Sequence, residues 1–351
     1  MTTTEAVLIQ HDELKPFVVS VLAAAGVPIV DAEIVADCLL AANLSGIDSH
    51  GIVRLNHYIR RLDNGTIKTN PELRFERRAA ALGHLDGGDG LGHVVTHRAT
   101  SHAMELASEA GCGIVSVANS SHFGMAGFHL MRIVDAGYAG ICTTATDRYV
   151  VPFGARHAFF GTNPIAFGFP GKGIPVIFDM ATSSVPYGKL ALAQVEGRPI
   201  PSHWGVDKDG NPTTDPNALV AIHPAAGPKG SGLGMVVDIL SSLFSGMPWG
   251  PHVNQMYAQL EGRRELGHLV MAIDIERLVP LQSFRTELGQ MIRELTAMQP
   301  ADGFDRVYFP GEPEGIRREQ RLQEGIPIER GLCQELTQLG DRFSIPFPAP
   351  R

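Results

Sequence analysis

The sequence predicts a mixed α/β fold. Short apolar runs with strand composition, such as GIVSVANS and PIAFGFP, recur along the middle of the chain between glycines and prolines. Longer stretches with helical spacing of apolar residues lie between them. The chain has 351 residues, of which 44% are hydrophobic, so it can bury a sizeable core, and a disordered chain is excluded.

The N-terminal part of the chain predicts amphipathic helices. A first helix begins near His11 and ends at Gly26, because glycine is common just after a helix C-terminus. Asp31 is placed to cap a second helix, which ends at Gly46. We therefore expect helices to form this part of the molecule.

A third helical segment carries a possible anion-binding group. His50, Arg54 and Tyr58 are spaced by four residues, so a single helix would place all three on one face. Arginine offers a two-pronged set of donors to a carboxylate, and His50 could converge on the same ligand. The alternative is an ordinary exposed helix face, where such cations are common.

The periodicity changes after about residue 79. Residues 80–87 and 113–120 predict strands, residues 91–110 and 125–137 predict helices, and residues 140–146, 164–170 and 175–181 predict further strands. Residues 198–224 form a long polar excursion rich in turn residues, typical of a functional loop or an insertion. Helical patterns return at residues 231–246, 291–298 and 314–325.

Charge and cysteine content exclude several classes of partner. The net charge of −8 does not favour a nucleic acid or an anionic membrane surface. The four cysteines form no C-x-x-C pair, so we expect reduced thiols rather than a zinc site or a disulfide framework. With no signal-peptide pattern and no apolar run of about 20 residues, a cytoplasmic protein is expected.

His122 is the first candidate for catalysis. It lies in NSSHFG, between a predicted strand and a predicted helix, which is a usual place for a catalytic group in open α/β sheets. Histidine can take a hydroxyl proton near neutral pH. The alternative is a histidine that caps the following helix.

Two segments could bind a nucleotide. AAGPKGSGLG is a glycine-rich turn before a helix, whose free N–H groups, together with Lys229, could hold a phosphate. It departs from the Walker A order, and no G-x-G-x-x-G occurs, so the usual dinucleotide fingerprint is absent. Asp179 follows an apolar strand and could accept from ribose hydroxyls or cap the next segment.

A metal site is the weaker alternative. His93, His97 and His102 lie on one predicted helix, and two histidines four residues apart could bind a metal with a third ligand from elsewhere. No H-E-x-x-H motif is present, and this spacing is frequent by chance. We assign no metal.

Seven segments resemble one enzyme family. SHGIVR, NSSHFGMAG, VVPFGA, GTNPIAFGFPG, FDMATSS, AAGPKGSGLG and VYFPGE occur in this order within residues 11–328. Together they resemble the malate/L-lactate dehydrogenase family that lacks the Rossmann fold. The resemblance implies a cytoplasmic homodimer that oxidises a small carboxylate substrate with NAD, with NADP as the alternative cofactor. It also implies a mixed-sheet cofactor-binding body at residues 76–283 and a helical domain made of residues 1–75 and 284–351.

The resemblance also implies roles for individual residues. His122 is the proton acceptor. His50 matches the histidine that other members use as the acid/base group, so it is the second catalytic candidate. We assign the binding of the substrate to Ser49, Arg54 and Tyr58, together with His50. The positions that contact the dinucleotide in the family are Thr146, Asp179, Met180, Ala181, Lys229, Gly230, Gly311, Glu312 and Pro313.

The resemblance extends to the substrate. HWGVDKDGNPTTDP, HPAAGPKGSGL and RELTAMQPADGFDRVYFPG are most similar to the members that oxidise ureidoglycolate to oxalurate in allantoin and purine breakdown. Malate, lactate, a diketogulonate or a cyclic imino acid are the alternative substrates. A metal-dependent hydrolase or lyase and a non-catalytic binding protein are the alternatives outside this class.

Overall fold

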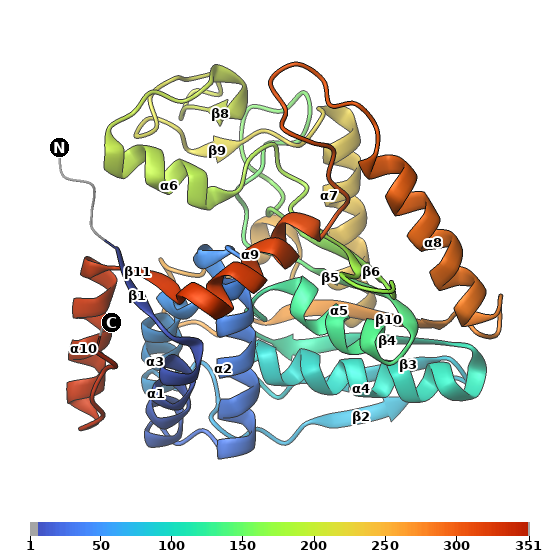
Figure 1. Ribbon diagram of the computed structural model, residues 1–351. Helices are drawn as coiled ribbons and strands as arrows, with labels where there is room; N and C mark the ends of the chain where they lie inside the picture. The colour runs from blue at the N-terminus through green and yellow to red at the C-terminus, as the bar shows by residue number, and fades with distance from the viewer. Residues whose placement is uncertain (1–5, 350–351) are drawn as a thin grey trace.

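The computed structural model describes residues 6–349 and confirms a mixed α/β fold (Figure 1). Its centre is a seven-stranded sheet in the order β2-β3-β4-β10-β5-β6-β7, in which only β3 and β4 run parallel. The strands are β2 (Arg74–Arg77), β3 (Leu82–Asp86), β4 (Cys112–Ser120), β5 (Tyr138–Thr144), β6 (Ile165–Phe169), β7 (Val176–Met180) and β10 (Leu266–Asp274).

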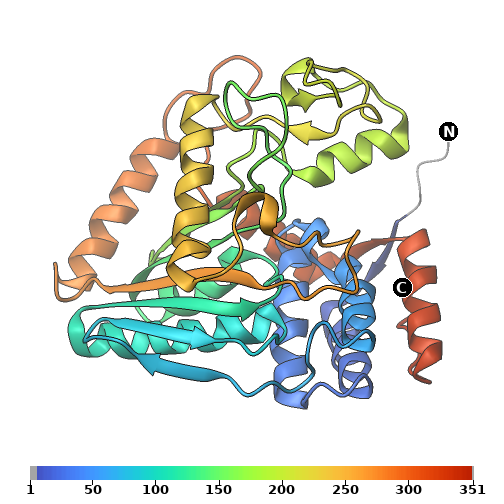
Figure 2. The same cartoon turned by 180° about the vertical axis from the view of Figure 1, so that it is seen from behind.

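Helices cover both faces of this sheet. α4 (Gly92–Ala110) and α5 (Ala126–Asp135) pack on one face, and α7 (Pro228–Ser241) packs against β5 and β10 on the other (Figure 2). The core beneath α4 and α5 contains Val95, Leu130 and Val270, all fully buried. No helix within residues 6–349 combines the length and apolar composition that a membrane span requires.

The central strand β10 has no counterpart in the sequence-based assignment. Residues Leu266–Val270 are all buried, because helices cover both faces of the strand. A strand buried on both sides loses the alternation of apolar and polar residues that identifies strands in a sequence.

Segments from the two ends of the chain meet beside the sheet. β1 (Ala6–Ile9) pairs antiparallel with β11 (Ile326–Glu329), and one apolar core joins residues from the N-terminal helices to Leu336 and Leu339. The helices of this region are α1 (His11–Ala24), α2 (Ile29–Leu44), α3 (Leu55–Asp63), α9 (Glu312–Glu324) and α10 (Arg330–Arg342). The division into domains at residues 75 and 284 stays a prediction; residue 284 falls inside α8 (Leu281–Thr296).

Two local expectations are wrong. α2 begins at Ile29 with Pro28 as its N-cap, so Asp31 lies in the first turn, where it forms an ion pair with Arg98 (3.4 Å) instead of capping. The segment from His50 to Tyr58 is not one helix, but two 3-10 turns, η1 (Asp48–His50) and η2 (Ile52–Arg54), followed by α3.

The polar excursion at residues 198–224 belongs to a small lobe with its own core (Figure 1). This lobe contains α6 (Tyr187–Glu196), the turn η3 (Ser202–Trp204) and the short hairpin of β8 (Gly205–Val206) and β9 (Ala221–Ile222). Leu190, Ile200 and Ile222 form its buried centre. Two further turns, η4 (Leu243–Ser245) and η5 (Gly250–His252), connect α7 to the segment before β10.

Buried histidines make the fold sensitive to acid. His93, His129 and His268 are fully buried, and burial lowers their pKa values to about 3, about 4 and about 3. These histidines stay neutral in the folded chain but bind protons near pH 6.5 when the chain is unfolded. Proton binding therefore favours the unfolded chain below pH 6.5, and the free energy of unfolding falls as the pH falls towards 4.

We therefore expect urea unfolding at pH 7.0, 5.5 and 4.5 to give a steep loss of unfolding free energy. Three such groups contribute a slope of up to about 4 kcal/mol per pH unit, at about 1.4 kcal/mol for each. His268→Gln removes one titrating group and should lower the slope by up to about 1.4 kcal/mol per pH unit. Equal stability at pH 7.0 and 4.5 would contradict this account.

Candidate active site

His122 lies in the short turn that joins β4 to α5. Ser121 fixes this turn, because its hydroxyl accepts the Gly92 N–H (2.8 Å) and donates to the Gly90 carbonyl (2.9 Å). Gly124 has a positive φ of 79°, and a Cβ there would lie 2.6 Å from the Cys38 sulfur. A glycine is therefore needed where the turn passes the helices beneath it.

Two aromatic side chains surround the His122 ring. The Tyr58 hydroxyl lies 2.7 Å from His122 Nδ1, and the Gly124 N–H lies 3.3 Å from the same nitrogen. The His50 ring stacks on His122 with centroids 5.6 Å apart. Tyr58 is fully buried, so its side chain lies behind His122 and orients it. The two candidate histidines and Tyr58 thus share one site.

Both histidines are kept neutral. The pKa of His122 is well below its usual value, first because of burial and then because a proton on His122 would be repelled by protonated His50 or His93 and by the charged Arg54 and Arg264. Burial and the Arg54 charge lower the pKa of His50 to about 4. Near pH 7 each ring therefore has one lone pair that can accept a proton.

The turns that carry His50 are held by a network from the ends of the chain. Asn43 accepts the Ile52 N–H at 2.8 Å and donates to Asp48 at 2.7 Å. Arg321 of α9 donates to both carboxylate oxygens of Asp48, at 2.7 and 3.0 Å. A Cβ on Gly51 would lie 2.2 Å from Asn43 Oδ1, so a larger residue cannot fit without movement.

Arg54 extends from these turns towards the same site. Its Nε donates to the Ser49 carbonyl oxygen at 2.6 Å, and the Ser49 hydroxyl lies 3.0 Å from His50 Nδ1. The Arg54 guanidinium carbon is 5.5 Å from the centroid of the Tyr257 ring. Arginine, serine and histidine are therefore oriented together, as a carboxylate-binding group requires.

The segments expected to contact a dinucleotide meet around β7. Ile177 in β7 donates to the Pro310 carbonyl at 3.1 Å, which places the turn before α9 beside the strand. The Thr182 carbonyl accepts the Ala225 N–H at 2.9 Å, which joins the end of β7 to the turn before α7. The structure therefore brings residues 179–181, 229–230 and 311–313 to neighbouring positions.

Thr146 joins the same region through Asn163. Asn163 accepts the Thr146 N–H at 3.0 Å and donates to the Gly234 carbonyl of α7 at 2.9 Å. Asn163 was not among the sequence-based site residues, although it lies in GTNPIAFGFPG. Its positive φ of 35° is a structural feature that no spacing pattern reveals.

The residues present fit a dinucleotide. α7 and α9 both begin at a glycine with positive φ, Gly227 and Gly311, and a Cβ on Gly311 would lie 2.9 Å from the Ile177 nitrogen. The N-terminus of α7 suits a pyrophosphate, whereas the first turn of α9 carries the carboxylates of Glu312 and Glu314 and packs on β7. Lys229 and Met180 are exposed beside the starts of these helices, while Gly230 is buried against the Ala225 carbonyl.

Two acidic residues of this region already have partners. Asp179 accepts the Gly127 N–H at 2.7 Å and so caps α5, instead of the segment that follows it. Burial raises its pKa to about 6. The buried Glu312 carboxylate binds Arg306 at 2.5 Å. The Glu312 N–H donates to the Phe309 carbonyl at 3.1 Å, so both its side chain and its N–H have protein partners.

Within the described part of the chain, the histidines of α4 do not form a metal site. Tyr58 packs edge-on against His93 with ring centroids 4.9 Å apart, and Arg132 donates to the His97 carbonyl at 3.0 Å. His102 stacks on Phe75. Across residues 6–349, no three His, Cys, Asp or Glu side chains are grouped closely enough to hold a metal.

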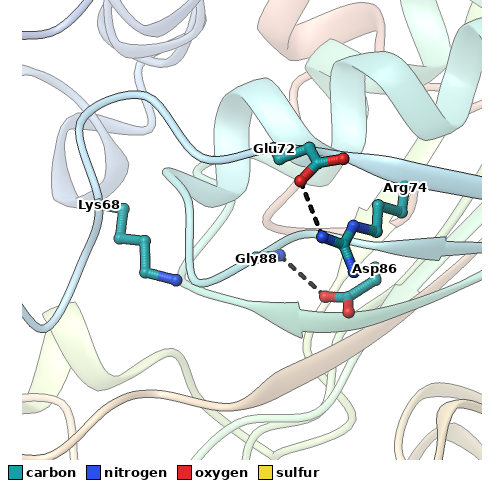
Figure 3. A pocket seen from close by; sticks show the side chains of 5 residues that line it. All are labelled: Lys68, Glu72, Arg74, Asp86 and Gly88. Atoms are coloured by element: carbon teal, nitrogen blue, oxygen red, sulfur yellow. Dashed lines mark hydrogen bonds and ion pairs between the residues drawn. The ribbon is translucent and has the colours of Figure 1, made fainter.

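A cavity of about 250 Å³ lies at the edge of the sheet (Figure 3). Its charged groups have partners: Glu72 binds Arg74 at 2.8 Å, Asp86 accepts the Gly88 N–H at 2.9 Å, and Lys68 lies 3.6 Å from Asp89. Asp86 also accepts from Asn119, near the end of β4. We therefore regard this cavity as part of the support for the His122 turn.

Known dehydrogenases resemble this chain over nearly its full length. Malate dehydrogenase from Pyrococcus horikoshii is 37% identical over 96% of both chains, and its solved structure superposes with a TM-score of 0.90 over 99% of this chain and 98% of that one. Ureidoglycolate dehydrogenase (NAD(+)) from Escherichia coli is 38% identical, covering 93% of this chain and 94% of the relative. L-sulfolactate dehydrogenase from Methanocaldococcus jannaschii is 35% identical, covering 96% and 98%.

These similarities define the class as a dehydrogenase that acts on 2-hydroxy acids. The model of the malate/L-lactate dehydrogenase family matches residues 9–337, and the chain belongs to this family. Relatives are named for NAD(+) and for NADP(+), so the family's dehydrogenases use NAD(P).

Proposed function

We propose that this protein oxidises ureidoglycolate to oxalurate with NAD, in the breakdown of allantoin. One observation carries the choice of substrate. Arg54 lies beside Ser49 and His50, whereas Arg264 is buried in an ion pair with Asp147 (2.9 Å). A single guanidinium suits ureidoglycolate, which has one carboxylate and a neutral ureido group, better than malate or sulfolactate, which carry a second anion.

His122 is the proton acceptor in this proposal. It takes the substrate hydroxyl proton, and the imidazolium that forms is stabilised by the Tyr58 hydroxyl oxygen, which lies 2.7 Å from Nδ1 and accepts from it once both ring nitrogens carry protons. The substrate carboxylate at Arg54 adds a negative charge, which offsets the positive charges that lower the pKa of His122. Binding of the substrate thus improves the base.

The cofactor would be held by the segments around β7. The start of α7, Lys229 and the backbone at residues 179–181 are the groups that suit a dinucleotide, with residues 311–313 beside β7 and Thr146 on the side of Asn163. The bound nicotinamide supplies the hydride acceptor. We also propose the homodimer that the family resemblance implies, which light scattering in solution tests.

The function is tested by following reduction of NAD and of NADP by absorbance. Ureidoglycolate, malate, lactate and sulfolactate serve as parallel substrates. We expect kcat/KM to be highest for ureidoglycolate with NAD, at least tenfold above kcat/KM for malate. A higher kcat/KM for malate or sulfolactate would overturn the proposed substrate but not the family. A preference for NADP would overturn the proposed cofactor.

A further inference from the structure

The segment between η5 and β10 is held rigidly against α3. We call residues 254–264 the Tyr257 loop. The guanidinium of Arg61, which is 1% exposed, donates to four carbonyl oxygens of this loop. These belong to Gln255 (3.4 Å), Met256 (2.7 Å), Gln259 (3.4 Å) and Gly262 (3.0 Å). A buried arginine that satisfies several carbonyls holds a loop in one conformation.

The same loop is fixed to the cofactor side of the site. Asp147 accepts from Arg264 at 2.9 Å and from the Met256 N–H at 3.2 Å. Asp147 directly follows Thr146, the residue bonded to Asn163. The Tyr257 loop therefore joins α3, which carries Tyr58, to the turn after β5.

This rigid loop presents one exposed aromatic side chain to the site. Tyr257 is 52% exposed, although its loop neighbour Met256 is buried. Its ring lies 5.2 Å from the His57 ring and 5.5 Å from the Arg54 guanidinium carbon. At this distance a tyrosine face attracts a guanidinium, which narrows the directions in which Arg54 can point.

We propose that Tyr257 is a substrate-binding and specificity residue, which orients Arg54 and offers an uncharged aromatic surface to the part of the substrate beyond its carboxylate. The inference rests on the proposed function of Arg54 as the carboxylate-binding group. The negative face of the ring favours a neutral planar group, such as a urea or amide, and disfavours a second carboxylate or sulfonate.

Steady-state kinetics of Tyr257 variants test the inference. In Tyr257→Ala, the substrate KM is expected to rise roughly tenfold, while kcat and the KM of NAD change less than about twofold. Tyr257→Phe retains the ring and should recover most of the substrate binding. Tyr257→Lys should raise kcat/KM for malate relative to ureidoglycolate at least tenfold, because it adds a cation beside the site.

The control is Glu261→Ala, an exposed position in the same loop, which should behave as the wild type. An unchanged substrate KM in Tyr257→Ala, or an equal rise in the KM of NAD, would overturn the proposal. An unchanged ratio of kcat/KM for malate to kcat/KM for ureidoglycolate in Tyr257→Lys would overturn it as well. If Arg54→Met also leaves the substrate KM unchanged, the proposed function fails; if only the Tyr257 variants behave as wild type, this inference alone fails.

Discussion

Replacing His122 with asparagine is expected to lower kcat roughly 10²–10⁴-fold, the usual contribution of a positioned general base. Asparagine keeps a polar side chain in the turn but cannot take the hydroxyl proton. Because the segments around β7 are not altered, the KM of NAD should change little. Stopped-flow measurement of the first turnover checks that the loss lies in the chemical step.

His50→Asn separates the two histidines. We expect it to raise the substrate KM more than it lowers kcat, since His50 is assigned to the carboxylate-binding group with Ser49 and Arg54. His102→Asn, which lies on α4 and stacks on Phe75, is the matched control. If His122→Asn keeps a near-normal kcat and His50→Asn loses most of its kcat, the proton acceptor is His50 and not His122.

Replacing Arg54 with methionine is expected to cost about 3 kcal/mol of transition-state binding, or roughly 10²-fold in kcat/KM, mostly through KM. Methionine keeps an apolar stem of similar length but removes the charge. Because the Arg54 charge lowers the pKa values of His50 and His122, both should rise in the variant. NMR titration of the histidine side chains measures that shift separately from activity.

Arg60→Met provides the control for Arg54. Arg60 lies on α3 and is exposed, so its loss should leave kcat/KM within about twofold. Equal losses in the two variants would mean that a general change in charge, and not a carboxylate-binding group, causes the effect. Arg54→Lys should recover only part of the loss, because an ammonium lacks the planar fork.

Much of the candidate site could be predicted locally. His122 stands between strand and helix patterns, and its position between β4 and α5 agrees with that prediction. The roles were harder to predict. The sequence puts Tyr58 on one helix face with His50 and Arg54 and the family resemblance assigns it to the substrate, yet it is buried behind His122 with its hydroxyl 2.7 Å from the ring. Spacing places residues on a face, but it does not say what packs against that face.

Local sequence patterns were enough to predict the α/β class, the helices α1 and α2 that end before a glycine, the strands β3 to β7 and the absence of the usual dinucleotide fingerprint. These features depend on residues a few positions apart, whose periodicity and turn chemistry act locally. The folded chain was needed to place β10 at the centre of the sheet, to pair β1 with β11, to cap α5 with Asp179 and to bring the Tyr257 ring to Arg54. Those contacts join residues far apart in the chain, so they depend on packing and burial, which short-range patterns do not contain.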